Sequence, residues 1–330
     1  MEIQSVLSMS PLRISFLGGG TDIPNFYTRS RGCVVSAAIN KYVYVHIKRH
    51  DPLFQERYRI SYSEVEHTNS RNDIKNGIVK GCLELLEIDE PIQISTSADL
   101  PANSGLGSSS SFAVALLNAL HVLRNENVSP VQLAEEACAV EIGLLGSPIG
   151  KQDQYAAAFG GINFFEFEAN GSVRIEPINL SISKVNELLD NTIMIWTSQS
   201  RNANTILNDQ ANQANLNYES LLKLTKLAQE FKSKLVEKDV DWNTLGPLIK
   251  KGWTLKQSLS EKIITDEVKI ITDRLDILGS VGYKLLGAGG GGFIFSVFGN
   301  KDKEIQSKLK TWHTFKPSLD FQGTRVVSVN

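Results

Sequence analysis

Cysteine is scarce in this chain of 330 residues, which has only Cys33, Cys82 and Cys138 and no C-x-x-C pair. An odd number of scattered cysteines does not suit a disulfide framework, so we expect reduced thiols buried in the core. The five histidines are also dispersed. His46 and His50 fall in a strand-like segment, where residues four apart lie too far from each other to share a metal ion. The sequence therefore predicts no zinc site.

An excess of charge of one sign is also absent, because 34 Lys and Arg residues nearly balance 36 Asp and Glu residues. Binding to nucleic acid usually needs a basic domain or stripe, so we expect no nucleic-acid partner. The longest apolar stretch, 112–123, contains Asn118 and His121 and is too short to cross a bilayer. The first residues, "MEIQSVLSMSPLRISF", lack the apolar run and cleavage site of a secretory signal. We therefore expect a cytoplasmic protein without a membrane partner.

The chain does have the composition and length of a globular protein, with 42% hydrophobic residues and room for one large or two medium domains. Strand patterns occur at 42–48, 92–99, "GGINFFEFE", "TIMIWTS", "YKLLG", "FIFSVF" and "RVVSV". Helical patterns occur at 112–123, at 131–145 with Ser129 as the cap, and over 202–279. A break at "EANGSVRIEPINLSISK" predicts two domains, 1–180 and 181–330.

The stretch "PANSGLGSSSSFAVALLNAL", 101–120, joins small polar residues directly to an apolar helical segment. The first N–H groups of a helix have no partner within the helix, and its N-terminus carries partial positive charge. A Gly/Ser entry of this kind therefore suits an anion, above all a phosphate. Serines also cap helices that bind nothing, so the motif by itself leaves a capped core helix open.

The segment "GAGGGG" matches the dinucleotide-binding pattern G-x-G-x-x-G at Gly287, Gly289 and Gly292. That pattern needs a helix after it, whereas "GFIFSVF" predicts a strand. We therefore expect a tight bend between two strands, where glycines let backbones pass closely. The stretch "LLGSPIGKQ" approaches a P-loop, but Leu145 and Gln152 occupy positions that require Gly and Ser or Thr.

Three motifs in order, "SPLRISFLGGGTD", "PANSGLGSSSS" and "KLLGAGGGGF", resemble those of the GHMP small-molecule kinases. A fourth stretch, "EIGLLGSPIGKQDQYAAAFGG", resembles the segment that bears the acidic residues of that family. Together they span Ser10 to Phe293, most of the chain. The resemblance implies a two-domain α+β kinase, with an N-terminal ATP-binding domain and a C-terminal ferredoxin-like domain. It implies an ATP-dependent phosphotransferase whose acceptor is an alcohol group and whose substrate lies between the domains.

The resemblance also implies how ATP and Mg²⁺ are bound. It assigns the nucleotide phosphates to Pro101, Gly105, Leu106, Gly107, Ser108, Ser109 and Ser110. It assigns Mg²⁺ to the Ser109 hydroxyl and the Glu141 carboxylate, since Glu141 precedes Asp153 by twelve residues as in the galactokinase branch. Mg²⁺ accepts few protein ligands and keeps several waters, so two hard oxygen ligands suffice. Without the resemblance, Glu141 reads as an ordinary exposed carboxylate near a helix end.

Two residues carry the predicted chemistry. Asp153 in "GKQDQ" matches the catalytic aspartate of the family, which implies a general base or an acceptor for the hydrogen bond of the substrate hydroxyl. Arg13 in "PLRIS" matches the basic residue beside the transferred phosphate, where a fixed cation stabilises charge that grows in the transition state. By themselves, Asp153 could merely favour a helix dipole and Arg13 could be a surface charge.

Substrate recognition is predicted in "LGGGTD", where galactokinases have Glu-His-Thr-Asp after the first glycine and this chain has Gly19, Gly20, Thr21 and Asp22. Asp22 is expected to bind ring hydroxyls, while the glycine pair leaves room for a longer or phosphorylated sugar. The chain looks most like the branch that phosphorylates the anomeric hydroxyl of D-glycero-D-manno-heptose 7-phosphate.

An anionic substrate needs cations, and Arg201 and Lys256 are the candidates for the distal phosphate, although each could be a solvated helix charge. A kinase of free fucose or galactose stays open, as do a catalytically inactive sugar- and ATP-binding regulator and a homodimer.

Overall fold

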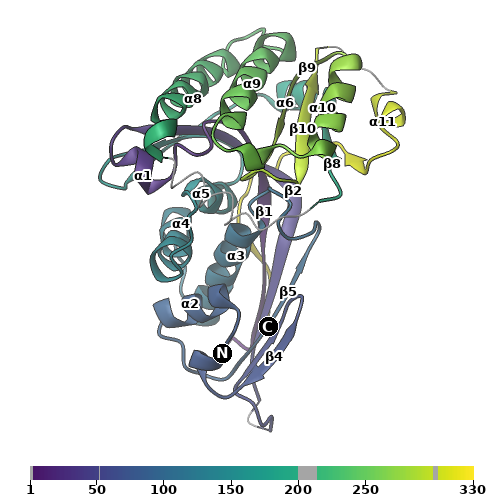
Figure 1. Ribbon diagram of the computed structural model, residues 1–330. Helices are drawn as coiled ribbons and strands as arrows, with labels where there is room; N and C mark the ends of the chain where they lie inside the picture. The colour runs from purple at the N-terminus through teal and green to yellow at the C-terminus, as the bar shows by residue number, and fades with distance from the viewer. Residues whose placement is uncertain (1–2, 52, 200–213, 300–303) are drawn as a thin grey trace.

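Two sheets, each covered by helices, organise the computed structural model, which describes residues 3–51, 53–199, 214–299 and 304–330 (Figure 1). In the described residues the first sheet has eight strands, in the order β12-β1-β2-β5-β3-β4, with β6 paired to β2 and β7 paired to β6. Its strands are β1 (Ser5–Leu17), β2 (Gly32–Arg49), β3 (Tyr58–Ser61), β4 (Val65–Thr68), β5 (Ile92–Ala98), β6 (Ile162–Phe167), β7 (Val173–Pro177) and β12 (Arg325–Val329).

The second sheet, in the C-terminal half, has the order β11-β8-β10-β9. Its strands are β8 (Thr192–Trp196), β9 (Ser280–Leu285), β10 (Phe293–Phe298) and β11 (Thr314–Phe315). All of its pairings are antiparallel. Helices separate β8 from β9 and β10 from β11, so the connection is the strand-helix-strand-strand-helix-strand path of a ferredoxin-like unit. This confirms the predicted ferredoxin-like C-terminal core.

Along the chain, the helices lie mainly between the strands of each half. They are α1 (Pro24–Tyr27), α2 (Gly77–Leu85), α3 (Ser108–Leu123), α4 (Pro130–Cys138), α5 (Gln152–Phe159), α6 (Ile182–Asp190), α8 (Ala214–Leu235), α9 (Trp242–Gln257), α10 (Asp266–Ile277) and α11 (Ile305–Lys308). Short 3-10 turns, η1 (Arg71–Asp73) and η3 (Glu261–Ile263), and a π-helix, η2 (Ala139–Leu144), complete the set. No helix in the described ranges is both long enough and apolar enough to cross a membrane.

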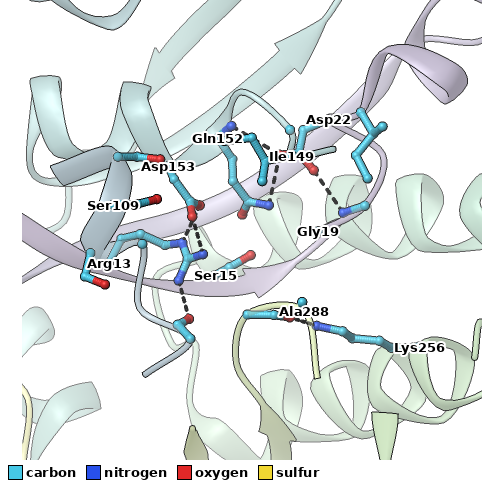
Figure 2. Close-up of a pocket in the computed structure, with 18 of the residues that line it drawn as sticks. Arg13, Ser15, Gly19, Asp22, Ser109, Ile149, Gln152, Asp153, Lys256 and Ala288 are labelled. Atoms are coloured by element: carbon cyan, nitrogen blue, oxygen red, sulfur yellow. Dashed lines mark hydrogen bonds and ion pairs between the residues drawn. The ribbon is translucent and has the colours of Figure 1, made fainter. Parts of the chain in front are cut away.

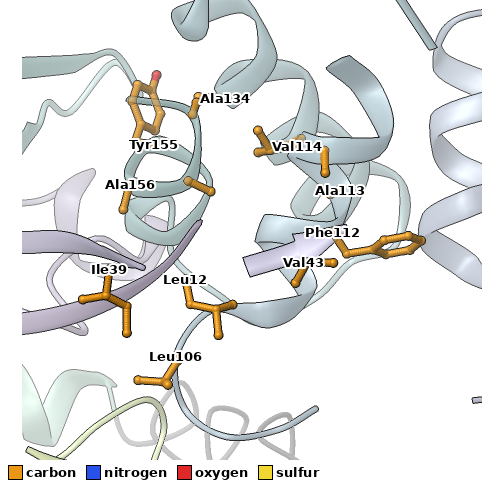
Figure 3. Close-up of a cluster of buried hydrophobic side chains, with 14 of the residues drawn as sticks. Leu12, Ile39, Val43, Leu106, Phe112, Ala113, Val114, Ala134, Tyr155 and Ala156 are labelled. Carbon is orange, nitrogen blue, oxygen red and sulfur yellow. The ribbon is translucent and has the colours of Figure 1, made fainter. Parts of the chain in front are cut away.

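The main core lies where α3, α4 and α5 pack on the long strands of the first sheet (Figure 3). Leu12 of β1 and Val43 of β2 belong to this core together with Val114 of α3, and Figure 3 shows Val43 beside Phe112. Small residues such as Ala134 let the helices approach each other closely. This packing holds the beginnings of α3 and α5 over β1, and these two helix ends carry the serines and the aspartate singled out in the sequence.

Several local predictions are confirmed. Ser129 caps α4 by accepting a hydrogen bond from the Gln132 backbone N–H. The thiols of Cys33, Cys82 and Cys138 are free and buried. The glycine-rich bend joins two strands, β9 and β10, and is not followed by a helix.

Two local predictions are wrong in detail. The helix expected over 131–145 is α-helical only to Cys138 and continues as the π-helix η2, which widens the turn that carries Glu141. The expected break contains β7 and α6, because "VRIEP" pairs with β6 and Ser181 caps the next helix. The last strand, β12, returns to pair with β1, so the end of the chain adds a strand to the first sheet. The boundary at residue 180 stays a prediction.

Candidate active site

A cavity of about 160 Å³ lies where the beginnings of α3 and α5 meet the end of β1 and the C-terminal half (Figure 2). Its lining combines residues from every motif quoted from the sequence. They are Arg13, Ser15, Gly19, Gly20, Asp22, Ile23, Asn103, Gly105, Gly107, Ser108, Ser109, Ser110, Ile149, Gly150, Gln152, Asp153, Lys256, Leu259, Lys284, Gly287 and Ala288.

The start of α3 has no side-chain cap, which favours an anion site over a capped core helix. The residue before the helix is Gly107, whose φ of +78° favours glycine and whose lack of a side chain leaves the first turn uncapped. By contrast, Asn76, Ser129 and Asp241 each accept a hydrogen bond from the first turn of their own helices. The uncapped N–H groups of α3 open on the cavity and suit phosphate oxygens.

The glycine-rich bend between β9 and β10 packs against the loop that precedes α3. This loop includes Ser104 and Gly105 and is called the phosphate loop below. A Cβ on Gly287 would lie 2.5 Å from Gly105 Cα, and a Cβ on Gly292 would lie 2.5 Å from Ser104 O. Phe293 N donates to Ser104 O at 3.0 Å. The expected close passage of two backbones is therefore confirmed, and it joins the C-terminal half to the phosphate loop.

Arg13 and Asp153 form a two-point ion pair at one end of the cavity. Arg13 Nε donates to Asp153 Oδ1 and Arg13 Nη2 donates to Asp153 Oδ2, each at 2.7 Å. Arg13 Nη1 donates to Gly105 O at 2.7 Å, which fixes the guanidinium against the phosphate loop. Arg13 lies inside β1 and is 4% exposed, so it is not a surface charge. Asp153 lies in the first turn of α5 and is more accessible than Arg13.

Glu141 and Ser109 are neighbours, as a shared metal site requires. Ser109 Oγ donates to Glu141 Oε1 at 2.8 Å, and Gln154 Nε2 donates to Glu141 Oε2 at 2.7 Å. Burial raises the pKa of Glu141, although the surrounding hydroxyl and amide donors favour its charged form. A hydroxyl and a carboxylate beside a phosphate loop are hard oxygen donors that fit Mg²⁺.

Asp22 lies at the other end of the cavity and is held by three donors. Gly20 N donates to Asp22 Oδ1 at 2.9 Å, while Gln152 N and Gln152 Nε2 donate to Asp22 Oδ2 at 3.1 and 3.0 Å. Burial, together with the negative charge of Asp153, raises the pKa of Asp22. The three donors therefore fix the orientation of the carboxylate at this end of the cavity.

Two lysines from the C-terminal half complete the lining. Lys284 of β9 donates from Nζ to Ser15 O at 2.8 Å and Phe16 O at 3.0 Å. Lys256 at the end of α9 donates to Gly287 O. Burial, reinforced by the charge of Arg13, lowers the pKa of Lys256 to about 8, and burial also lowers that of Lys284. Neither lysine forms an ion pair with a carboxylate of the described chain, and Lys256 brings positive charge to the cavity that a bound anion could neutralise.

Most of the residues predicted from sequence meet at this cavity, but some do not. Thr21 is fully buried and its hydroxyl is used in the turn, donating to Gly18 O at 2.8 Å and accepting from Cys33 N at 3.0 Å. Leu106 belongs to the hydrophobic core, and exposed Pro101 is not part of the lining. Arg201 lies outside the described residues.

Sequence reasoning missed four polar residues of the lining, namely Ser15, Asn103, Gln152 and Lys284. All four stood inside quoted motifs but had no expected role. Lys284 left one signal, since it is a single lysine in an otherwise apolar strand, "GYKLLG". A lysine there must find buried acceptors, and the carbonyls of β1 provide them.

One cavity brings together an uncapped helix start, a serine hydroxyl that contacts a carboxylate, and an Arg–Asp pair. This arrangement suits a phosphotransferase of the small-molecule kinase class. Residues 77–161 match the family described as the GHMP kinases N-terminal domain, and residues 217–313 match the GHMP kinases C-terminal domain.

Known proteins extend this match over nearly the whole chain. The D-glycero-alpha-D-manno-heptose 7-phosphate kinase of Campylobacter jejuni is 32% identical over 304 residues, with 89% of each chain covered. A galactokinase of Thermotoga petrophila is 26% identical, with 91% of this chain and 93% of the relative covered. The solved structure of a D-glycero-D-manno-heptose 1-phosphate kinase of Bacteroides thetaiotaomicron aligns with a TM-score of 0.80 at 23% identity, covering 98% of this chain and 99% of that one.

The chain therefore belongs to the GHMP kinases, a family of phosphotransferases that use ATP as the donor and a hydroxyl group as the acceptor.

Proposed function

We propose that this kinase transfers the γ-phosphoryl group of ATP to the anomeric hydroxyl of D-glycero-D-manno-heptose 7-phosphate, giving the 1,7-bisphosphate for nucleotide-activated heptose. The observation that carries the substrate class is Lys256, which lines the cavity that contains Asp22 and forms no ion pair with a carboxylate of the described chain. A buried cation without an ion-pair partner is costly, so its presence favours an anionic ligand. The relative from Campylobacter jejuni supports the same substrate.

The roles of the residues follow from their places around the cavity. The N–H groups at the start of α3 receive the phosphates of ATP. Ser109 and Glu141 would hold Mg²⁺, which neutralises phosphate charge when bound. Asp153 accepts the proton or the hydrogen bond of the attacking sugar hydroxyl. Arg13 holds Asp153 in position and stabilises charge on the transferred group.

Asp22 and Lys256 hold the acceptor. Asp22 binds a ring hydroxyl, because its carboxylate is fixed by Gly20 and Gln152 and lines the cavity. The Lys256 ammonium binds the distal phosphate as a charge-assisted donor. Arg201 stays a further candidate for that phosphate.

The test is a coupled assay for ADP release over heptose 7-phosphate, mannose 6-phosphate, galactose and fucose. The proposal expects the highest kcat/KM for heptose 7-phosphate. A higher kcat/KM for free galactose or fucose would replace it by the second candidate, a kinase of an unphosphorylated sugar. Relatives named fucokinase and galactokinase, 27% and 26% identical to this chain, favour that second candidate.

A catalytically inactive regulator is the least supported candidate, because Arg13 and Asp153 line the cavity as a formed pair and Glu141 contacts Ser109 of the lining. Absence of ADP release with every sugar of the panel would favour it.

A further inference from the structure

Two polar side chains of the cavity each keep one buried atom without a hydrogen bond in the described structure, namely Ser15 Oγ and Gln152 Oε1. Ser15 is 5% exposed and Gln152 is 9% exposed. A buried polar atom without a partner is destabilising, so native proteins rarely keep one unless a ligand or another group completes it. Both atoms belong to the lining, between the Arg13–Asp153 pair and Asp22 (Figure 2).

The orientation of the Gln152 amide is fixed by its neighbour. Gln152 Nε2 donates to Asp22 Oδ2 at 3.0 Å, and an ionised carboxylate can only accept. The amide nitrogen therefore faces Asp22, and Oε1 must face away from it. Oε1 is a pure acceptor, whereas the Ser15 hydroxyl can donate as well as accept.

Gly19 brings these two side chains around one small space. A Cβ on Gly19 would lie 3.4 Å from Ser15 Oγ, 3.4 Å from Gln152 Nε2 and 4.0 Å from Gln152 Oε1. Gly19 does not have a φ in the left-handed region, so its backbone does not demand glycine. By contrast, Gly20 has a φ of +98°, which does. A Cβ at position 19 would make ordinary contacts and occupy the room beside Ser15 and Gln152, whereas the turn explains the glycine at 20.

We propose that Ser15 and Gln152 form a hydroxyl-binding subsite above Gly19, which recognises a single ring hydroxyl of the sugar adjacent to the one bound by Asp22. The sugar hydroxyl donates to Gln152 Oε1 and accepts from Ser15 Oγ. One donor and one acceptor side by side match a neutral hydroxyl, and the acceptor repels a phosphate. Binding there orients the ring and so selects the hydroxyl that faces Asp153. The subsite rests on the proposed function for the sugar nature of the acceptor.

The experiment compares wild type, Ser15→Ala and a matched control on the preferred sugar and on its 2-, 3- and 4-deoxy analogues. The control is Ser36→Ala. Ser36 pairs with Ser15 across β1 and β2, and its buried Oγ also has no described partner, but it does not line the cavity. The readouts are kcat/KM for each sugar, the KM for ATP and the thermal unfolding midpoint.

The proposal expects wild type to lose about tenfold or more in kcat/KM on one of the deoxy analogues, because a site built to bind a hydroxyl rejects a ligand that lacks it. Ser15→Ala should lose about tenfold on the parent sugar and should lose little further on that same analogue. Ser36→Ala should keep the wild-type pattern. The KM for ATP should stay unchanged in all three proteins.

A purely structural role predicts a different pattern. If Ser15→Ala lowers kcat/KM by the same factor on the parent sugar and on every deoxy analogue, the subsite is refuted. Should Ser15→Ala fold poorly, Gly19→Ala decides the question. Its methyl group would fill the space between Ser15 and Gln152, so the KM for the sugar must rise several-fold without a change in the KM for ATP.

The outcome also separates this inference from the proposed function. If wild type prefers a free sugar, the heptose 7-phosphate proposal fails, and the deoxy series of that free sugar still tests the subsite. If heptose 7-phosphate is preferred but no deoxy analogue loses activity, the subsite fails while the proposed function stands.

Discussion

The two ends of the cavity differ in how completely their polar groups are paired. At the phosphate-loop end, Arg13 and Asp153 satisfy each other through two hydrogen bonds, and Ser109 and Gln154 both donate to Glu141. The other end, which contains Asp22, is called the sugar end below. There Lys256 and Lys284 donate only to backbone carbonyls. Two side-chain oxygens, Ser15 Oγ and Gln152 Oε1, have no hydrogen-bond partner in the described residues.

This difference indicates which groups are preorganised and which await a ligand. Groups that stabilise a transition state work best when they are already fixed, so they are paired before substrate arrives. Groups that recognise a ligand gain selectivity when the wrong ligand leaves them unpaired. On the proposed function, the phosphate-loop end carries the chemistry and the sugar end recognises the acceptor.

The largest effect should follow from breaking the preorganised end at Asp153. Asp153→Asn should lower kcat by about a hundredfold or more, the usual scale for a general base, with little change in the KM for ATP. Steady-state kinetics with the preferred sugar measure it.

The matched control for Asp153 is Asp241→Asn. Asp241 also begins a helix, where it accepts from Thr244 N at 2.9 Å, but it lies outside the cavity and asparagine caps a helix equally well. We expect wild-type kcat for the control. A well-folded Asp153→Asn protein with near-normal kcat removes Asp153 from the mechanism.

A large but selective effect should follow at the sugar end from Lys256→Ala. A charge-assisted hydrogen bond is worth roughly 1.5–3 kcal/mol, so the KM for the sugar phosphate should rise about ten- to a hundredfold. Free sugars should be affected little. Lys250→Ala is the control, because Lys250 lies on the same helix but pairs with Asp276 at 2.6 Å outside the cavity. Equal losses for phosphorylated and free sugars would contradict a phosphate-binding role.

The same lysine predicts a pH dependence. Burial and the charge of Arg13 lower the pKa of Lys256 to about 8, so the free enzyme loses this positive charge as the pH rises through that value. The KM for the sugar phosphate should therefore be low below pH 8 and should rise above it. Lys256→Arg should flatten the profile, because arginine stays charged. A profile that is the same in wild type and Lys256→Arg would assign the titration to another group.

A moderate effect is expected from Glu141→Gln at the preorganised end. The substitution keeps the shape of the side chain but removes its charge, so the Mg²⁺ concentration for half-maximal rate should rise about tenfold or more. A titration of Mg²⁺ at saturating ATP and sugar measures this. An unchanged titration curve would exclude Glu141 from the metal site.

The smallest effect should be that of Gly20→Ala, which tests whether the backbone conformation at position 20 requires glycine. Alanine at a φ of +98° is strained, so the free energy of unfolding should fall by about 1–2 kcal/mol, or a few degrees in Tm. Gly171→Ala, with a φ of +84° and open space around it, provides the control for strain alone. A drop confined to Gly171→Ala would show that the turn at Gly20 tolerates a side chain.

Short stretches of the sequence were sufficient to predict much of the backbone structure around the site. The phosphate loop, the start of α5 at Asp153 and the strand after the glycine-rich bend all follow from short stretches whose residues dictate their own backbone. The same stretches carried the resemblance to the GHMP kinases, which the comparisons confirm. The resemblance also assigned binding roles to residues that have structural roles. Thr21 forms hydrogen bonds within its own turn, and Leu106 packs in the hydrophobic core.

The sequence by itself thus determined the family, the two-domain α+β fold and the segments that surround the site. Only the tertiary structure decided which side chains within those segments face the cavity. Ser15 and Gln152 are 137 positions apart, and Lys284 meets β1 across 269 positions, because strand register and helix packing bring them together. No local pattern encodes such a meeting. Only the folded chain shows which polar atoms at the sugar end lack a hydrogen bond, and that Gly20 but not Gly19 has a positive φ.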